Sequence, residues 1–394
     1  MPLFLLPSKA VLNNIPLSLY IHIPWCIKKC PYCDFNSHEK NESFDETLYV
    51  KALLLDLDYE YKNCKQRSLH SIFFGGGTPS LFSAEAIRKI IDHTRQLFDF
   101  KDIEITLEAN PGTFEQEKFD AFREAGVNRL SIGIQSFNED HLKSLGRVHD
   151  DEQAFSAIET ARVAGFDNIN LDLMFGLPGQ SIQQAIDDVT IACDFSVPHI
   201  SHYQLTIEAN TYFHKHTPVL PENDLIWEMQ SQCQNILASK QYKQYEISAY
   251  SKANKQCAHN LNYWHFGDYI GIGAGAHGKL STVSDATKLK IMRQWKHRQP
   301  QKYIDASLNG KAISGDQELD QKDIVFEFLL NALRLKTGSD IKTFVKNTGL
   351  DFEVLNNAVK DIDDSLLFID NDNVRTTDRG FLFLNEILEK LLVE

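Results

Sequence analysis

The feature that most constrains this chain is a regular alternation of short apolar runs with amphipathic helical stretches between Leu17 and about Thr206. Six runs rich in β-branched and aromatic residues recur at 17–23, 71–74, 103–108, 129–135, 169–175 and 201–207. Strands that alternate with helices pair in parallel, because each helix returns the chain to the end at which the next strand begins. Six repeats fall short of the eight of a closed barrel. The sequence therefore predicts an α/β fold with a partial (β/α)6 barrel similar to a TIM barrel, in preference to a doubly wound sheet.

The alternation stops after residue 207, which divides the chain. We predict three regions: a barrel over 1–240, an extension over 241–315 and a C-terminal domain over 316–394. The extension contains HNLNYW (259–264) and GAGAHG (273–278), and its pattern is typical of irregular chain. A polar stretch near 283–315 is predicted to contain a domain boundary.

The C-terminal region has the pattern of three helices, a hairpin and a last amphipathic helix. That order favours a helical, winged-helix-like domain. Nine basic residues against seventeen acidic ones give the region a net charge of −8, so a DNA-binding role is disfavoured.

The composition of the chain indicates its cellular compartment and disfavours one class of partner. No apolar run approaches the length of a membrane-spanning helix, and the chain does not open with a secretory leader pattern. We therefore expect a soluble protein of the reducing cytoplasm, where clustered cysteines bind metal. The formal net charge of −14 disfavours nucleic acid as a partner.

Three of the seven cysteines, Cys26, Cys30 and Cys33, lie in WCIKKCPYCDF, directly after the first predicted strand. Thiolate is a soft, charged ligand for zinc or for an iron–sulfur cluster. A closed zinc site needs a fourth ligand, which His38 could supply. A cubane held by three cysteines instead leaves one iron open to substrate. Loops after the strands form the active face of such barrels, so the position favours the cubane over the zinc site.

Glycine-rich or polar motifs follow the other predicted strands. The glycines of FFGGGTPS (73–80) remove Cβ atoms that would keep a ligand from the backbone, and the motif has neither the lysine of a phosphate loop nor dinucleotide spacing. Glu108 and Gln135 close the third and fourth strands, and Asp172 interrupts the fifth. A buried carboxylate is costly without a partner, and a ligand, a backbone group or an arginine could each provide one.

The spacing C-x3-C-x2-C after a first strand, with an aromatic residue before the last cysteine, resembles the radical S-adenosylmethionine (SAM) superfamily. The resemblance implies a [4Fe-4S] cluster on Cys26, Cys30 and Cys33, whose open iron chelates SAM and which an electron donor reduces. In this class the cofactor carries the chemistry and the protein orients it. Motif by motif, the resemblance places SAM contacts at Tyr20, Tyr32, Gly76, Gly77, Thr78, Glu108, Gln135, Arg147 and Asp172.

The order of motifs over the first half of the chain resembles the oxygen-independent coproporphyrinogen III oxidase-like group. Oxidases of that group carry a further cysteine two residues after the third, where this chain has Phe35, and a longer segment before the first strand. Both departures are similar to the HemW branch, and they imply a heme chaperone that passes heme to an acceptor protein. Oxidase chemistry is the alternative, and whether the chain is an enzyme stays open.

HNLNYW is the motif of that branch, and it makes His259 the expected axial heme ligand, since aromatic side chains beside it can pack on a porphyrin. A core histidine in an ordinary aromatic cluster is the other reading. Cys257, His265 and His277 lie in the same segment as rival ligands.

Two further patterns are expected to carry no chemistry. GAGAHG matches G-x-G-x-x-G by chance, because no βαβ unit surrounds it. Cys64, Cys193 and Cys233 lie on helical stretches and are predicted to be small core residues.

Overall fold

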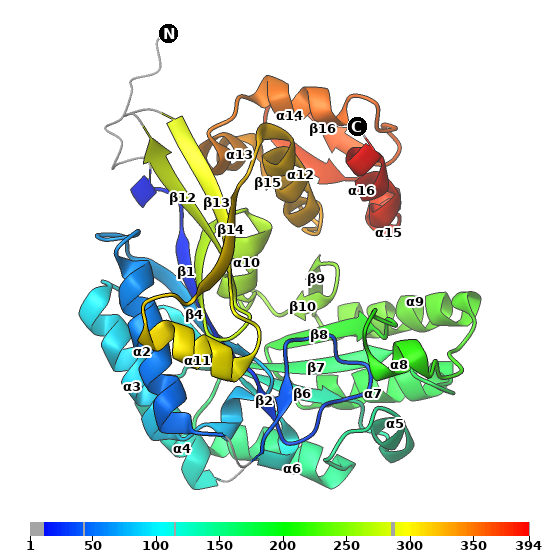
Figure 1. Cartoon of the computed structure of the whole chain (residues 1–394). Helices are drawn as coiled ribbons and strands as arrows, with labels where there is room; N and C mark the ends of the chain where they lie inside the picture. The colour runs from blue at the N-terminus through cyan, green and yellow to red at the C-terminus, as the bar shows by residue number, and fades with distance from the viewer. Residues whose placement is uncertain (1–11, 42–43, 114–115, 285–287, 394) are drawn as a thin grey trace.

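The computed structural model describes residues 12–41, 44–113, 116–284 and 288–393, so the first residues of the predicted barrel region lie outside it. Six strands form its centre: β1 (Leu17–Ile23), β4 (Leu69–Gly76), β5 (Glu104–Ala109), β6 (Arg129–Gln135), β7 (Ile169–Phe175) and β8 (His199–Gln204). They neighbour one another in chain order, and every pair is parallel (Figure 1). Each of the six predicted runs overlaps one of these strands, which confirms the α/β fold.

The connections between these strands are helical. They are η1 (Pro79–Leu81), η2 (Pro111–Thr113), α2 (Glu46–Tyr61), α3 (Ala84–Leu97), α4 (Gln116–Ala125), α5 (Glu139–Ser144), α6 (Asp151–Val163) and α7 (Ile182–Asp194). Two of them begin with a capping box, in which Asp150 pairs with Gln153 and Ser181 pairs with Gln184. Just past the ends of α4 and α6, glycines at 126 and 165 take positive φ angles of 110° and 82°, a conformation common where a helix ends.

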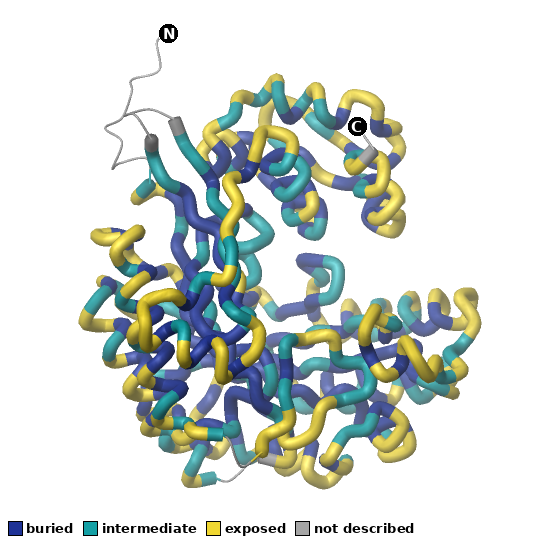
Figure 2. The backbone as a smooth tube through the Cα atoms, in the orientation of Figure 1, coloured by how far each residue is buried: buried dark blue, intermediate teal, exposed yellow. Residues whose placement is uncertain are grey.

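The core lies between the sheet and these helices. All seven residues of β6 are buried, and β1 and β7 are buried at every position except Tyr20 and Asp172. Strands covered on both faces lose the usual polar alternation, which explains their continuous apolar sequence. In Figure 2 the buried backbone follows the sheet, and the exposed backbone follows the surrounding helices and loops.

The extension over 241–315 was expected to be irregular, and this expectation was wrong, because it adds strands to both edges of the same sheet. At one edge β11 (Asp268–Ile272) pairs in parallel with β1, followed by β12 (His277–Ser284), β13 (Lys288–Lys296) and β14 (Ile313–Glu318). At the other edge stand β10 (Ala249–Ser251) and β9 (Lys243–Glu246). The sheet therefore has twelve strands in the described residues and does not close into a ring.

Helices accompany these outer strands: α8 (Tyr212–Lys215), α9 (Asn223–Ser239), α10 (Ala258–Trp264) and α11 (Pro300–Leu308). HNLNYW lies on α10. The described part of the polar stretch near 283–315 contains β13 and α11. The short pair β2 (Trp25–Cys26) and β3 (His38–Glu39) brackets the cysteine loop. The division of the chain into three domains stays a prediction.

Two buried ion clusters attach the outer strands to the barrel. Lys296 of β13 lies 2.6 Å from Asp56 and 2.5 Å from Glu60, both on α2, and all three side chains are fully buried. Asp268 of β11 pairs with Arg67 at 2.7 Å and with Lys279 at 2.9 Å. Removing one partner of such a cluster leaves an uncompensated buried charge, so these contacts fix the position of β11–β13.

The C-terminal part matches the predicted order of elements. Its helices are α12 (Gln321–Ala332), α13 (Ile341–Thr348), α14 (Phe352–Val359), α15 (Asp378–Leu382) and α16 (Leu384–Val393), and its strands are β15 (Ser339–Asp340), β16 (Leu367–Ile369) and β17 (Asn373–Thr376). Phe328, Phe344 and Leu355 form a separate core together with Phe266 and Ile291 of the extension. Within the described chain, every helix is too short or too polar to cross a membrane.

Candidate functional site

The cysteine loop begins where β1 ends and is held by its own backbone. The Cys33 N–H donates to the Cys30 carbonyl at 3.1 Å, and the Lys29 ammonium donates to the carbonyls of Phe35 and Ser37, each at 3.3 Å. The β2–β3 pair closes the base of the loop. These contacts gather three thiols that are spread over eight residues of chain.

All three thiols line one cavity of about 550 Å3, which we call the cofactor cavity. The other predicted residues that line it are Tyr32, Gly76, Gly77, Thr78, Glu108, Gln135, Arg147 and Asp172. Strands β4, β5, β6 and β7 and the cysteine loop after β1 therefore place polar residues around a single space, as expected of parallel strands whose carboxyl ends meet at one face. Tyr20 and His259 are the two predicted site residues that do not line this cavity.

The thiols fit an iron–sulfur cluster better than one metal ion. Burial raises the pKa of Cys26 to about 11 and also raises the pKa of Cys33, so metal loading would release protons. Among the described residues no group of three or more His, Cys, Asp or Glu side chains is close enough to hold a single ion. That finding argues against the zinc alternative with His38. Cluster thiolates, in contrast, need not converge on one atom.

The glycine segment is required by protein contacts. Gly76 has a φ of +120°, and a Cβ there would lie 2.6 Å from Cε1 of His22. A Cβ on Gly77 would lie 2.6 Å from the Trp25 carbonyl oxygen. The glycines thus let β4 approach the start of the cysteine loop, a reason beyond the ligand access that the sequence suggested.

Glu108 accepts a hydrogen bond from the Gly76 N–H at 3.1 Å. Burial is the main cause that raises its pKa to about 8, and the nearby carboxylate of Asp172 adds to the shift. Burial also raises the pKa of Asp172, which accepts hydrogen bonds from Ser131 at 3.0 Å and Asn170 at 2.8 Å. A cationic ligand beside these two acids would offset the cost of burying their carboxylate forms.

Arg147 contacts the cysteine loop directly. Its guanidinium donates to the Cys30 sulfur at 3.6 Å, to Asn110 Oδ1 at 2.8 Å and to the Gly133 carbonyl at 2.7 Å. The contact with Cys30 holds that side chain at the cofactor cavity. Arg147 can therefore support the cluster ligand as well as the SAM carboxylate that the resemblance suggested.

Gln135 stands at a bulge with a φ of +69°, which is unusual for a residue other than glycine. Its side-chain oxygen accepts a hydrogen bond from the Tyr203 hydroxyl at 2.7 Å. Tyr203 and Asn110 line the same cavity and were missed, although Tyr203 lies in the predicted strand 201–207 and Asn110 lies two residues after Glu108. Their positions at the ends of β8 and β5 were the available signal.

His259 is a residue of α10, and its side chain is buried, with 1% of the residue's surface exposed. Its Nδ1 lies 2.8 Å from the Ser71 hydroxyl and its Nε2 lies 2.9 Å from the Tyr263 hydroxyl, and its ring stacks on Phe73. Both ring nitrogens are thus engaged. Axial heme ligation by His259 remains a prediction, and it would require breaking the hydrogen bond at the nitrogen that binds the iron.

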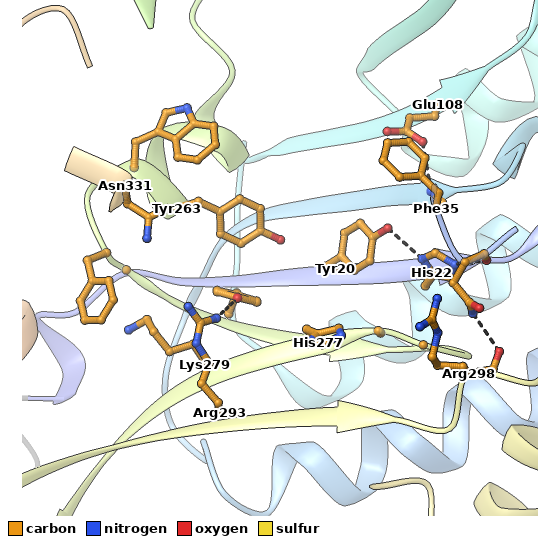
Figure 3. A pocket seen from close by; sticks show the side chains of 18 residues that line it. Tyr20, His22, Phe35, Glu108, Tyr263, His277, Lys279, Arg293, Arg298 and Asn331 are labelled. Carbon is orange, nitrogen blue, oxygen red and sulfur yellow. Dashed lines mark hydrogen bonds between the residues drawn. The ribbon is translucent and has the colours of Figure 1, made fainter. Parts of the chain in front are cut away.

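Tyr20 faces a second space, which we call the aromatic cavity. This cavity has a volume of about 560 Å3 and lies beside the first, sharing Phe35, Gly76, Glu108 and Trp264 as walls. Its other aromatic walls are Tyr263, Phe266 and Tyr269, and its cationic residues are Lys279, Arg293 and Arg298 (Figure 3). The Tyr20 hydroxyl lies 2.9 Å from Nδ1 of His22, and its contact with SAM stays a prediction.

Comparison with known proteins agrees with the fold and the cysteine loop. Residues 20–190 match the model of the radical SAM superfamily, and residues 319–383 match the model of the HemN C-terminal domain. The structure of the radical SAM enzyme coproporphyrinogen III oxidase (HemN) from Escherichia coli superposes with a TM-score of 0.80. That likeness covers 98% of this chain and 92% of the other at 22% identity, so it concerns the fold alone. Fold and site together define a radical SAM protein.

Relatives of higher identity narrow the class. The chain is 47% identical to a protein of Haemophilus influenzae and 45% identical to one of Escherichia coli, both named heme chaperone HemW. The first alignment covers 96% of this chain and 98% of the relative, and the second covers 96% and 99%. This chain belongs to the HemW family, which confirms the resemblance seen in its motifs.

Proposed function

We propose that this chain is a heme chaperone that binds heme and transfers it to an acceptor protein, and that it carries a [4Fe-4S] cluster with SAM. The likeness over nearly the full length to relatives named heme chaperone HemW carries the proposal. The cytoplasm is the expected compartment, and all seven cysteines are free thiols.

Cys26, Cys30 and Cys33 are the proposed cluster ligands, supported by their common cavity and by the arginine beside Cys30. When bound, a cluster on three thiolates supplies an open iron for SAM and accepts an electron from an external donor. The residues proposed to hold SAM are the polar strand ends around that cavity, from Gly76 to Asp172. Glu108 and Asp172 are suited to the cationic parts of SAM, and Arg147 to its carboxylate.

Phe35 favours the chaperone over the oxidase alternative. Its side chain is 59% exposed and lies between the two cavities, at the position where oxidases of the resembling group carry a cysteine. An aromatic surface there offers a porphyrin a packing partner and gives a cluster no further ligand.

The deciding experiment uses full-length protein purified and reconstituted without oxygen. Iron and sulfide analysis should give a [4Fe-4S] cluster, hemin titration should reach one equivalent, and heme should pass to an apo-acceptor. Incubation with coproporphyrinogen III, SAM and a reductant should leave the substrate unchanged. Decarboxylated product would support the oxidase instead. One zinc per chain without labile sulfide would remove the cluster from the proposal.

A further inference from the structure

We infer that heme occupies the aromatic cavity, with the imidazole of His277 as an axial ligand of the iron and Arg298 beside a propionate. This inference rests on the proposed chaperone function and specifies where its cargo binds. Figure 3 shows the residues that carry it: Tyr20, Tyr263 and His277 surround one space, with Lys279 and Arg293 toward one end and Arg298 toward the other.

The backbone around His277 is held in place by close packing. A Cβ on Gly273 would lie 2.3 Å from the His22 carbonyl oxygen, and a Cβ on Gly275, whose φ is +80°, would lie 2.4 Å from the Asn36 amide nitrogen. Asn36 in turn donates to the Ala274 carbonyl at 2.8 Å. GAGAHG is therefore the loop that joins β11 to β12 and packs against the cysteine loop, and it sets His277 at the cavity.

His277 has both ring nitrogens available. It is exposed, and no hydrogen bond joins its imidazole to any other described residue. His22, the other histidine that lines this cavity, contacts the Tyr20 hydroxyl with one nitrogen and the Asn36 carbonyl with the other. Partial burial of the ring and the charges of Arg293 and Arg298 lower the pKa of His277, which favours the neutral imidazole, the form that binds metal.

The walls of the cavity suit a large, flat ring with anionic groups on its edge. Tyr263 and Tyr269 meet edge to face at 4.5 Å, and a volume of about 560 Å3 lies in the range of roughly 300–1,000 Å3 that buries a cofactor-sized ligand. Arg293 is paired with Glu327 and Lys279 with Asp268. Arg298 forms no ion pair within the described residues and is exposed at the cavity, free to meet a carboxylate.

The test is an anaerobic hemin titration of the full-length, cluster-reconstituted protein, followed by absorption and electron paramagnetic resonance spectra. His277→Ala should remove the imidazole-ligated spectrum and weaken hemin binding by at least about tenfold. Added imidazole should restore that spectrum. Arg298→Gln should keep the spectrum and weaken binding about twofold to fivefold, as expected of an exposed ion pair. His297→Ala, a nearby histidine outside the cavity lining, is the matched control.

His259→Ala separates the two candidate ligands. The inference expects it to keep the axial-ligand spectrum. Loss of that spectrum in His259→Ala, with His277→Ala unchanged, would overturn the inference and assign the iron to His259. Iron and sulfide content and the thermal midpoint report whether each variant is folded. Wild-type protein that binds no hemin would contradict the proposed function itself. Hemin binding that His277→Ala leaves unchanged would contradict only the inference about its ligand.

Discussion

The cofactor cavity and the aromatic cavity share a wall, yet the chain builds them differently. The first collects the ends of consecutive parallel strands, so its residues recur at regular intervals along the sequence. The second joins β1 and the cysteine loop to β11–β13, segments about 250 residues apart, through the pairing of β1 with β11. Periodic sequence thus encodes the first, while the second depends on one long-range strand pairing and the buried ions that secure it.

The largest expected effect separates the two cavities by chemistry. Cys30→Ala should abolish the cluster, because only two of the four irons would keep a cysteine ligand from the protein. Hemin affinity should change little, since Cys30 does not line the aromatic cavity. Iron and sulfide analysis beside a hemin titration measures both. Cys193→Ala, at a buried cysteine on α7 outside either cavity, is the control and should keep both groups. Loss of hemin binding in Cys30→Ala would show that the cavities are not independent.

A second change strikes the shared wall. Gly76→Ala places a Cβ against His22 at a φ of +120°, so we expect a loss of roughly 2–5 kcal/mol in the free energy of unfolding. Gly165→Ala is matched, with a φ of +82° but no atom within 4 Å of its Cβ, and should cost about 1–2 kcal/mol from backbone strain alone. Thermal midpoints compare the two. Equal shifts in the thermal midpoint would mean that the His22 side chain can move to make room for the added Cβ.

The sequence predicts the cofactor cavity better than the aromatic cavity. Each predicted strand of the parallel core was found, and eleven of the twelve residues proposed for cluster and SAM line one cavity, because strand ends converge wherever a sheet is parallel. Tyr20 lines the aromatic cavity instead, and no motif indicates its hydrogen bond to His22. Strands β12 and β13 were missed because KLKIMRQWK alternates basic and apolar residues in a stretch that reads as polar loop. The partners of His259 come from β4 and α10 and lie outside any local pattern.

Glu108→Gln tests the electrostatics on the cofactor side. The pKa of Glu108 is raised to about 8, so between its usual value near 4.3 and 8 the folded chain holds a proton that the unfolded chain has lost. That difference lowers stability as pH rises through this window. Glu108→Gln should therefore raise the free energy of unfolding of the apoprotein at pH 8 by about 1–3 kcal/mol and change it little near pH 4. Thermal midpoints at the two pH values measure the difference. Glu124→Gln, at an exposed position on α4, is the control. An equal gain in stability at both pH values would show that the protonation of Glu108 is not its cause.

The smallest predicted effect concerns the contact between the two loops. Asn36→Ala removes hydrogen bonds to the carbonyls of Ala274 and Arg298, both 2.8 Å long, at a cost of about 1–2 kcal/mol. Hemin affinity should fall a few-fold because GAGAHG loosens, while cluster content is kept. Asn309→Ala, which removes one exposed bond to Asp305 on α11, is matched and should leave both unchanged. Cluster loss in Asn36→Ala would show that this residue supports the cysteine loop first.

The central claim is that one chain holds its cluster and its heme at the same time, in neighbouring cavities. The most direct measurement is a titration of the cluster-loaded protein with hemin, with iron, sulfide and heme determined on the protein recovered by gel filtration. The account predicts one heme per chain alongside a complete [4Fe-4S] cluster, with sulfide unchanged throughout the titration. Release of iron and sulfide as heme binds, or heme retained only by protein that lacks the cluster, would contradict it.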